Sequence, residues 1–300
     1  MNNPSIMPTM PGSEQDLLLN LKKKYLPNLR NSLILILLLI VAIIELLPLL
    51  WLFSTSLRLP AQSYDLPPDF LPTSFRWQNY QAVFASSEIN FPLFFFNSLK
   101  IAIIVTTGQL LTCSLAAFAF ARLRFKGRDA LFLFALATMM IPGQATIIPY
   151  FILMTKLKLI DSHWALILPA LTSAFGIFLL RQHFLSLPEE LIDAAKIDGA
   201  GFFQIYWEIF LPLIGPGLST LGVFTFIGSW NNFYSANIFL RSWDKFTLPI
   251  AMVQLRGYMG SGSIAEQLAA ICLSILPLAI LFIFGQKFVI ESYTRTGIKG

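Results

Sequence analysis

The amino-acid sequence predicts an all-α membrane protein with six transmembrane helices. Hydrophobic residues make up 56% of its 300 residues and charged residues only 12%, about half the charged fraction of a typical soluble domain. Six long apolar runs follow one another along the chain, and about 20 apolar residues are needed to cross roughly 30 Å of hydrocarbon. The runs lack the alternating pattern of membrane β-barrel strands. Helices, which satisfy their backbone hydrogen bonds internally, are therefore the predicted spans.

The six predicted spans, in chain order, are Leu33–Phe53, Ile101–Ala121, Ala130–Met154, Ala165–Leu180, Leu213–Trp230 and Leu268–Ile290. The fourth run is the shortest and contains Pro169, so its helix is predicted to extend to Trp164 and to about His183. The four prolines at Pro142, Pro149, Pro169 and Pro277 interrupt the third, fourth and sixth spans. A proline frees backbone carbonyls that need other partners in lipid. Bent helices around a cavity and ordinary packing of curved helices both account for this pattern.

Positive charges set the predicted orientation, because cytoplasmic segments near span ends carry an excess of Lys and Arg. Thirteen of the 21 basic residues lie in segments assigned to the inside and seven in the other loops, with Lys100 ambiguous at a span end. Both termini are therefore expected in the cytoplasm. The predicted organisation is a tail at residues 1–30, a six-helix domain at residues 31–290 and a second tail at residues 291–300. The short basic clusters flank apolar runs, so we interpret them as topology signals and expect no nucleic-acid partner.

The segment between the fourth and fifth spans, residues 183–212, is much longer than a connecting turn and is predicted to be cytoplasmic. Ser186, Pro188 and Glu189 predict a helix start, with the serine as cap and Glu189 completing a capping box. The helix is expected to end at about Asp198, because Gly199 can adopt the left-handed conformation. A second, amphipathic helix follows, and its apolar stripe consists of Phe202, Ile205, Tyr206 and Ile209.

The first helix of this loop presents a small, slightly acidic face, formed by Leu191, Ala194, Ala195 and Asp198. Such a face suits close approach by another protein, while the second helix is expected to pack against the inner ends of the spans. An amphipathic helix pair on the membrane surface with no protein partner accounts for the periodicity equally well.

The residues of this loop resemble the EAA loop of ABC importer permeases. The matching positions are Pro188, Asp193-Ala194-Ala195, Ile197-Asp198-Gly199-Ala200, Phe203, Ile205 and Leu211-Pro212. The resemblance implies a type I ABC importer permease fold, with coupling helices that sit in a groove of a separate ATPase. The implied ATPase contacts are Glu190, Asp193, Ala194, Ala195, Asp198 and Gly199. Asp193 stands where the family usually has glutamate, so any salt bridge to the ATPase needs a slightly different geometry.

Most of the chain is similar to the carbohydrate-uptake branch of that family, and to its maltose-type inner permeases with six spans. The supporting stretches are Trp77-Gln78-Asn79-Tyr80, Asn97-Ser98, residues 117–122, residues 125–128, Trp230-Asn231-Asn232-Phe233 and Thr247-Leu248-Pro249. The resemblance implies an inner-membrane heterodimer with a second permease subunit. It also implies an external solute-binding protein and two ATP-binding subunits, which hold ATP and Mg. The expected solute is a disaccharide or small oligosaccharide, with a polyol or glycerol-phosphate-type solute as the alternative.

Three polar residues are candidates for the solute path. Glu45 lies near the middle of the first span, where an ionisable side chain costs on the order of 2–3 kcal/mol unless it finds a partner. A structural hydrogen bond beside Pro48 is the other explanation. Asn231 and Asn232 follow Trp230, and their amides could bind sugar hydroxyls or form part of an interfacial belt.

Two other classes of membrane protein are alternatives to a permease subunit. A self-contained secondary transporter needs interrupted helices in two related halves and intramembrane ionisable residues, and Glu45 is the one candidate. A membrane enzyme needs a cluster of catalytic or metal-binding groups at one depth. The sequence contains no phosphate-loop motif, and His163 and His183 lie at opposite ends of the fourth span. We therefore expect a non-catalytic protein with no metal or cofactor of its own.

Overall fold

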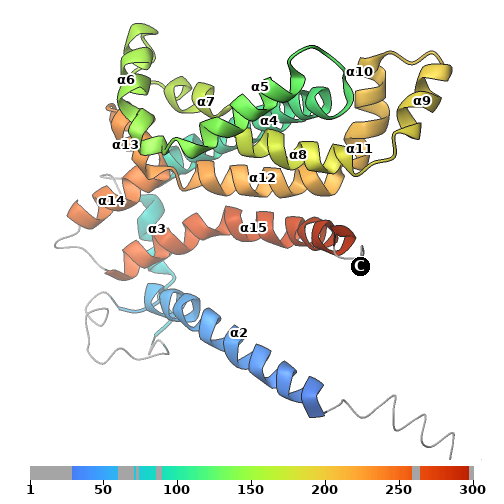
Figure 1. Ribbon diagram of the computed structural model, residues 1–300. Coiled ribbons are helices and arrows are strands. Elements are labelled where there is room, and N and C mark those ends of the chain that lie inside the picture. Colours follow the sequence, from blue (N-terminus) through green and yellow to red (C-terminus); the bar gives the residue numbers. More distant parts are fainter. Residues whose placement is uncertain (1–28, 60–70, 72–73, 86–89, 259–263, 297–300) are drawn as a thin grey trace, which may run out of the picture. The chain divides into compact units, whose positions relative to one another are not determined.

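The computed structural model describes residues 29–59, 71, 74–85, 90–258 and 264–296, and the regular structure in these residues is helical (Figure 1). The chain divides into two units, Met1–Ser54 and Thr55–Gly300. The predicted N-terminal tail, residues 1–30, lies almost wholly outside the described residues. Part of the predicted C-terminal tail is helical, because the last helix continues to Thr296.

The first unit consists of helix α2 (Leu29–Ser56) up to Ser54. The stretch Asn31–Ser56 has a mean hydropathy of 3.2 and is long enough to cross a membrane, which confirms the predicted first span. Pro48 lies inside this helix. Glu45 lies one turn before Pro48 and is exposed on this unit, so its role in the solute path stays a prediction.

The second unit contains the other five predicted spans. Three single spans are formed by α4 (Phe91–Arg122), by α7 (Trp164–Ala170) with α8 (Ala174–Leu185), and by α15 (Ile264–Thr296). Two bent helix pairs supply the remaining two, at residues 128–156 and 202–230. Counting each bent pair as one span, the described residues contain six candidate spans, as the sequence predicts.

The third span is broken near its middle rather than continuous. It consists of α5 (Arg128–Ala137), η2 (Thr138–Met140), η3 (Gly143–Thr146) and α6 (Ile147–Lys156). The axis turns by 95° at the break. Ile141 has the extended angles φ −89° and ψ 116°, because the ring of Pro142 disfavours helical geometry at the preceding residue. In contrast, Pro149 sits in the first turn of α6 and Pro277 inside the unbroken α15.

The fourth span is interrupted between α7 and α8, and side chains of α4 compensate the freed carbonyls. The Gln109 amide donates to the carbonyl oxygen of Ala170 at 3.0 Å, and the Thr112 hydroxyl donates to that of Leu171. Gln109 in turn accepts a hydrogen bond from the Thr225 hydroxyl. Because unpaired backbone groups are costly in an apolar medium, these bonds stabilise the interruption.

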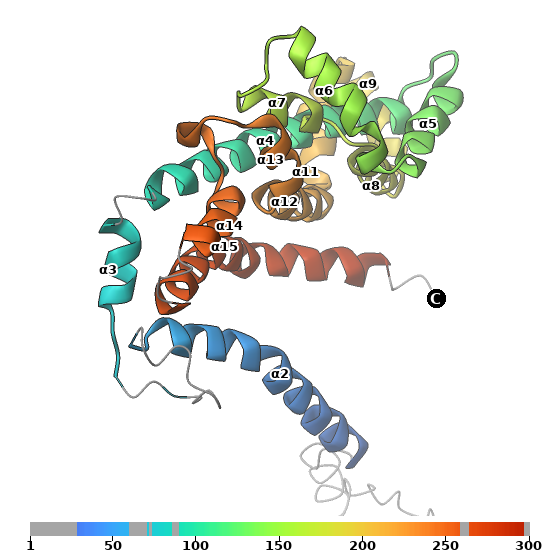
Figure 2. The same cartoon turned by 90° about the vertical axis from the view of Figure 1, so that its left-hand side faces the viewer.

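Helix α4 is the centre of the second unit. It packs against α8 and against α12 (Gly215–Trp230), and α12 packs against α15 (Figures 1 and 2). Four shorter elements lie in the long segments after the first and the fifth predicted spans: α3 (Gln78–Ala85), α13 (Phe233–Phe239), η5 (Trp243–Lys245) and α14 (Leu248–Tyr258). Figure 1 shows α6, α13 and α14 at one end of this unit and the long loop at the other.

The crossing of α8 and α12 depends on a glycine, Gly217, which faces the ring of His183. A Cβ atom built on Gly217 would lie 2.5 Å from Cδ2 and 2.7 Å from Cγ of His183. Overpacking of this kind costs about 1–3 kcal/mol, so we expect Gly217→Ala to lower the melting temperature of the purified protein by several degrees. Gly228→Ala in the same helix is the matched control, because its Cβ would meet no heavy atom within 4 Å. Equal melting temperatures for both variants would contradict the prediction.

Candidate functional site

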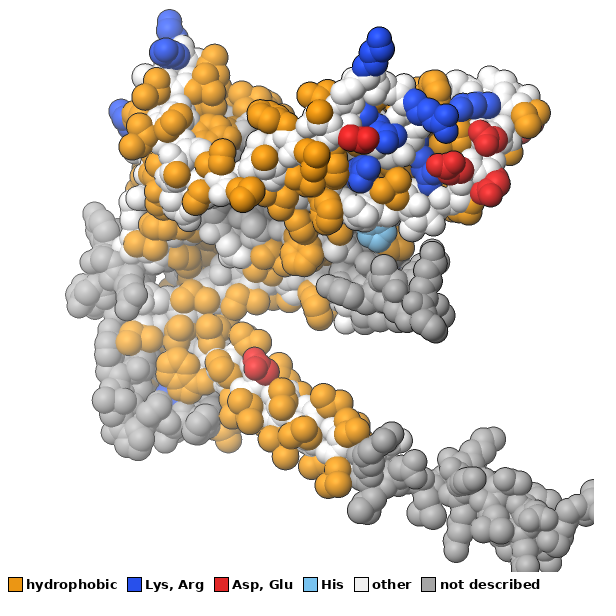
Figure 3. All heavy atoms as spheres, viewed as in Figure 1, with side chains coloured by type: hydrophobic (Ala, Val, Ile, Leu, Met, Phe, Trp, Pro, Cys, Tyr) orange, Lys and Arg blue, Asp and Glu red, His pale blue; other side chains and the backbone are white. Residues whose placement is uncertain are grey.

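The long loop, residues 183–212, begins in the last turn of α8. It then forms two short helical segments, which lie between the end of α8 and the start of α12. The first is α9 (Glu190–Ile197). The second is continuous and comprises α10 (Phe202–Gln204), the π-helical η4 (Ile205–Phe210) and α11 (Leu211–Leu213). On the face shown in Figure 3, many charged side chains gather over this end of the second unit. The predicted pair of helices is therefore confirmed.

The predicted cap at the start of α9 is wrong. Ser186 instead ends α8, where its hydroxyl donates to the carbonyl oxygen of His183 at 2.8 Å. Glu189 occupies the cap position of α9 and makes no capping hydrogen bond through its side chain. Ser186 lies between the end of α8 and the start of α9. Its hydroxyl bonds to α8 because the His183 carbonyl, three residues earlier in the chain, is within hydrogen-bonding distance.

The end of α9 matches the prediction. Gly199 has a φ of +82°, and its N–H donates to the carbonyl oxygen of Lys196 at 3.0 Å. The N–H of Ala200 donates to the carbonyl oxygen of Ala195 at 2.9 Å. These two bonds form a Schellman motif, which requires a left-handed residue at the position of Gly199.

One predicted ATPase contact, Ala195, is buried in the chain's own core and is only 6% exposed. Ile192 and Ala195 lie three residues apart, so both face inward on α9. The opposite face carries Glu190, Ala194 and Ile197, which are spaced by four and three residues, and Ile197 is 87% exposed. Ile197 matches the family loop in the sequence but was not among the predicted ATPase contacts, and its exposure became visible only in the structure.

The other predicted contacts on this loop are exposed: Glu190, Asp193, Ala194, Asp198 and Gly199. A protein partner could therefore reach them without any rearrangement of the loop. Their contact with an ATPase stays a prediction.

The second helical segment buries most of the predicted stripe, because Ile205 and Tyr206 are buried and Ile209 packs against the same core, but Phe202 is exposed and Phe210 is buried in addition. Ile205, Tyr206 and Phe210 are at most 1% exposed, whereas Phe202 is 53% exposed. A π-helix bonds residue i to residue i+5, so η4 carries Phe210 onto the face of Ile205. The Tyr206 hydroxyl lies 2.7 Å from that of Ser114 on α4. As predicted, this segment packs against ends of the spans, here those of α4 and α8, and the cytoplasmic location of these ends stays a prediction.

Arg122 connects α4 to the loop and is only 3% exposed. Its Nη2 atom donates to the carbonyl oxygens of Phe184 and Leu187, and its guanidinium lies 5.3 Å from the ring centre of Phe210. Nη1 is 3.9 Å from the carboxylate of Glu189. A buried arginine thus ties the end of the second span to both ends of the loop.

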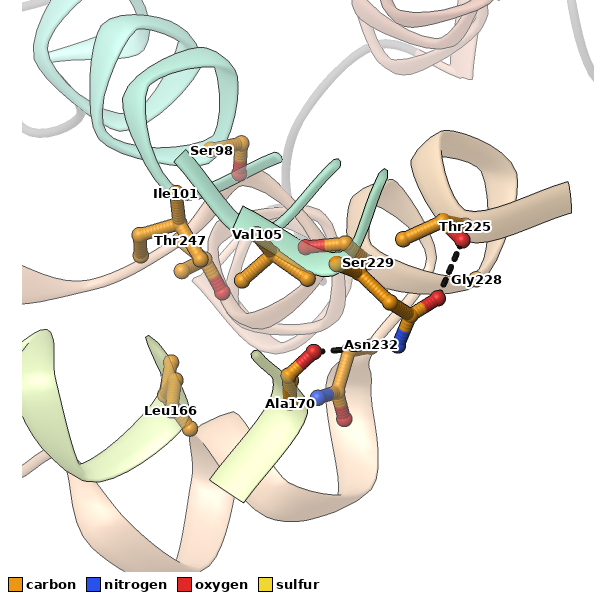
Figure 4. Close-up of a pocket in the computed structure, with 11 residues that line it drawn as sticks. Ser98, Ile101, Val105, Leu166, Ala170, Thr225, Gly228, Ser229, Asn232 and Thr247 are labelled. Carbon is orange, nitrogen blue, oxygen red and sulfur yellow. Dashed lines mark hydrogen bonds between the residues drawn. The ribbon is translucent and has the colours of Figure 1, made fainter. Parts of the chain in front are cut away.

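A cavity of about 240 Å³ with a mixed polar and apolar lining lies among α4, α7, α12 and the residues that precede α14 (Figure 4). Its lining residues are Ser98, Ile101, Val105, Gln109, Leu166, Ala170, Thr225, Gly228, Ser229, Asn232 and Thr247. A second cavity of about 370 Å³ shares Leu166, Ala170 and Asn232 with it. Among the described residues, neither cavity is lined by a charged side chain.

Of the two predicted asparagines, only Asn232 lines the cavities. Its Oδ1 atom accepts a hydrogen bond from the Ser235 N–H at 3.1 Å and so begins α13. Asn231 ends α12 and is exposed. Sequence reasoning also missed Gln109 and Thr225, although a polar residue inside an apolar run is itself a signal.

Comparison with known proteins gives matches along most of the chain. The model of a family described as binding-protein-dependent transport system inner membrane component matches residues 109–294. The chain is 37% identical to the arabinooligosaccharides transport system permease protein AraQ of Halalkalibacterium halodurans, over 87% of this chain and 93% of that protein. It is 32% identical to the galactooligosaccharides transport system permease protein GanQ of Bacillus subtilis, over 88% and 94%.

Two further matches extend the range of solutes named. The sn-glycerol-3-phosphate transport system permease protein UgpE of Yersinia enterocolitica is 32% identical, over 85% of this chain and 92% of that protein. The crystal structure of a bacterial ABC transporter involved in the import of the acidic polysaccharide alginate matches with a TM-score of 0.74 and 25% identity. That match covers 94% of this chain and 100% of the chain in the crystal structure.

Proposed function

This chain belongs to the family of binding-protein-dependent transport system inner membrane components, and we propose that it carries a neutral oligosaccharide across the membrane. It is a multi-pass membrane protein and a permease subunit of an ABC importer. The proposal concerns its solute, its energy source and its partners.

The lining of the two cavities carries the proposal about the solute. Hydroxyl and amide groups line the first cavity, at Ser98, Gln109, Thr225, Asn232 and Thr247. The second adds the aromatic rings of Tyr150, Tyr234 and Phe239. Groups of this kind bind sugar hydroxyls, whereas phosphate is usually held by Arg or Lys, which the described lining lacks. The cavities therefore favour a neutral sugar over glycerol phosphate, a solute named for one relative.

The exposed face of α9 supports coupling to a separate ATPase, which would hold ATP and Mg and perform the hydrolysis. Ala194 and Ile197 offer an apolar contact, and Glu190 adds a negative charge beside them. Because Arg122 joins the loop to α4 and the Tyr206 segment packs on the same helix, a push on α9 would reach the spans. The loop would act as a lever.

The remaining partners follow from the same proposal. The chain would pair with a second permease subunit, two ATP-binding subunits and an extracytoplasmic solute-binding protein, with lipid around its spans. Both termini and the long loop would face the cytoplasm. A self-contained secondary transporter is the alternative, and the two differ in their need for the ATPase.

Uptake by proteoliposomes separates these possibilities. The complete importer, with its external binding protein, should take up radiolabelled arabinotriose or galactotriose in the presence of ATP and should not take up glycerol 3-phosphate. Preference for glycerol 3-phosphate would overturn the assignment of the solute. Uptake by this chain in liposomes without any ATPase would overturn the assignment of the energy source.

Filling the first cavity tests whether solute passes through it. A Cβ atom on Gly228 would meet no heavy atom within 4 Å, so a side chain can begin there without a clash with the surrounding helices. We expect Gly228→Leu to lower ATP-driven arabinotriose uptake by about tenfold or more, the equivalent of at least about 1.4 kcal/mol. Co-purification of the ATPase should be unchanged. Gly228→Ala is the smaller control, and normal uptake by Gly228→Leu would show that the solute takes another route.

A further inference from the structure

The segment between α13 and α14, residues 240–247, borders the first cavity and is held by groups distant in sequence. We name it the rim segment. On one side it meets the loop between α6 and α7, and on the other side it meets α4. Thr247, its last residue, lines the cavity. The position of Thr247 is therefore set by whatever holds the rim segment.

Asp161 is the main tie on the first side. Its carboxylate accepts hydrogen bonds from the N–H groups of Arg241 and Ser242, both at 2.9 Å, and from the Ser242 hydroxyl. The Lys245 ammonium donates to it at 3.0 Å. The N–H of Asp161 donates to the carbonyl oxygen of Phe239 at 2.8 Å. One aspartate thus gathers four donors from the rim segment.

The backbone at Asp161 has a φ of +60°, a left-handed conformation that is costly for a residue other than glycine. The hydrogen bonds around the carboxylate compensate this cost. The Ser242 hydroxyl, followed by the backbone N–H of Ser242, holds the pKa of Asp161 well below its usual range. The carboxylate therefore stays ionised at the pH of a living cell.

The second side is fastened by α4. The Asn97 amide donates to the carbonyl oxygens of Asp244 at 2.9 Å and Phe246 at 3.0 Å. Just beyond the rim segment, the N–H of Leu248 donates to the Ser98 hydroxyl at 2.8 Å. The rim segment is thus a fixed wall of the cavity, held from both sides.

Thr247 is the residue of the rim segment that lines the first cavity, and its hydroxyl is not engaged in a hydrogen bond with another described residue. It is 5% exposed, and its hydroxyl has no hydrogen-bond partner among the residues that the structure describes. Figure 4 shows this hydroxyl directed toward the space between Val105 and Leu166. A buried hydroxyl without a partner is costly, so a hydroxyl-bearing solute in the cavity would relieve that cost.

We propose that the Thr247 hydroxyl binds a hydroxyl group of the solute and that Asp161 is the positioning residue that holds Thr247 in place. The inference rests on the proposed import of a sugar. It adds a specific contact and a residue, outside the cavity, on which that contact depends.

The proposal is tested by equilibrium binding of radiolabelled arabinotriose to the purified membrane complex. That complex contains both permease subunits and both ATP-binding subunits, without the external binding protein. Thr247→Val keeps the shape of the side chain and removes the hydroxyl, so the Kd should rise about three- to tenfold, the usual effect of one lost hydrogen bond. Asp161→Asn keeps one acceptor and removes the charge, and it should raise the Kd in the same range. Asp244→Asn is the matched control, because Asp244 is exposed and its backbone rather than its side chain binds Asn97.

The double variant distinguishes positioning from general damage. If Asp161 acts through Thr247, the double variant loses the same contact only once. Its Kd should then be no higher than the Kd of whichever single variant binds arabinotriose less tightly. Multiplied effects, an unchanged Kd for Thr247→Val, or no arabinotriose binding by the wild type would each overturn the inference. If one of these results is found and the wild type still shows ATP-driven arabinotriose uptake, the inference fails and the proposed function stands. If the wild type shows no such uptake, the proposed function itself is overturned.

Discussion

Replacing Gly199 with valine is expected to weaken association of the ATPase by about tenfold or more and to lower ATP-driven uptake with it. Gly199 has a φ of +82°, and left-handed geometry costs a residue with a Cβ atom roughly 1–2 kcal/mol, more when that atom is branched. The Schellman hydrogen bonds from Gly199 and Ala200 terminate α9. Their loss would unwind the last turn of the helix and change the orientation of its exposed face. We expect the amount of ATPase that co-purifies with the tagged chain to fall by about tenfold or more.

Two other glycines separate this effect from simple bulk or strain. Gly201 lies two residues further along with the ordinary angles φ −76° and ψ 160°, and Gly127 has the same φ of +82° outside the loop. A Cβ atom on either would meet no heavy atom within 4 Å, as at Gly199. Gly201→Val and Gly127→Val should therefore both retain the ATPase. Equal loss of the ATPase in Gly127→Val would attribute the effect to strain anywhere in the chain.

Replacing Arg122 with methionine is expected to uncouple the loop from the spans. The guanidinium donates to the carbonyl oxygens of Phe184 and Leu187, and each hydrogen bond from a charged donor contributes about 1.5–3 kcal/mol. Methionine keeps the length of the stem and leaves both carbonyls without this donor. The loop should then open locally more often, and uptake should fall by about tenfold or more.

Trypsin provides a second measurement, because Lys196 lies on α9 and is exposed. Cleavage after Lys196 should be at least several times faster in Arg122→Met than in the wild type, since cleavage requires the helix to open. Arg124→Met is the matched control, because Arg124 is an exposed neighbour of the same charge. Wild-type uptake and cleavage in Arg122→Met would mean that the loop is held by its apolar contacts alone.

Local chemistry explains why parts of the long loop could be predicted from the sequence. Gly199 meets a requirement of its own backbone, and the end of α9 depends on residues within five positions of it. The prediction for Ser186 was wrong because two helix ends lie within its reach, and the sequence does not indicate which one its hydroxyl serves. The sequence shows the helical period of α9, but it does not show that the face with Ala195 points into the core. That direction depends on the core formed by α4 and α8.

The cavity shows the opposite situation. Gln109 contacts a carbonyl 61 residues away and a hydroxyl 116 residues away, and Asp161 ties a segment about 80 residues away. No periodicity links such positions, because their meeting depends on how the helices pack. Asn232 was predicted from its polarity beside Trp230, yet the same reasoning applied equally to Asn231, which is exposed and lines neither cavity.

The sequence by itself determined the number of apolar runs and the glycine turn that ends α9. Each of these depends on hydrophobicity or on backbone sterics over a few neighbouring residues, and such effects act before any tertiary contact forms. Only the tertiary structure decided that Ile197 is exposed while Ala195 is buried, that Arg122 holds the loop, and that Thr247 faces a cavity. The orientation of a side chain toward a distant partner is a property of the packed helices, since burial and hydrogen bonding are settled between segments far apart in the chain.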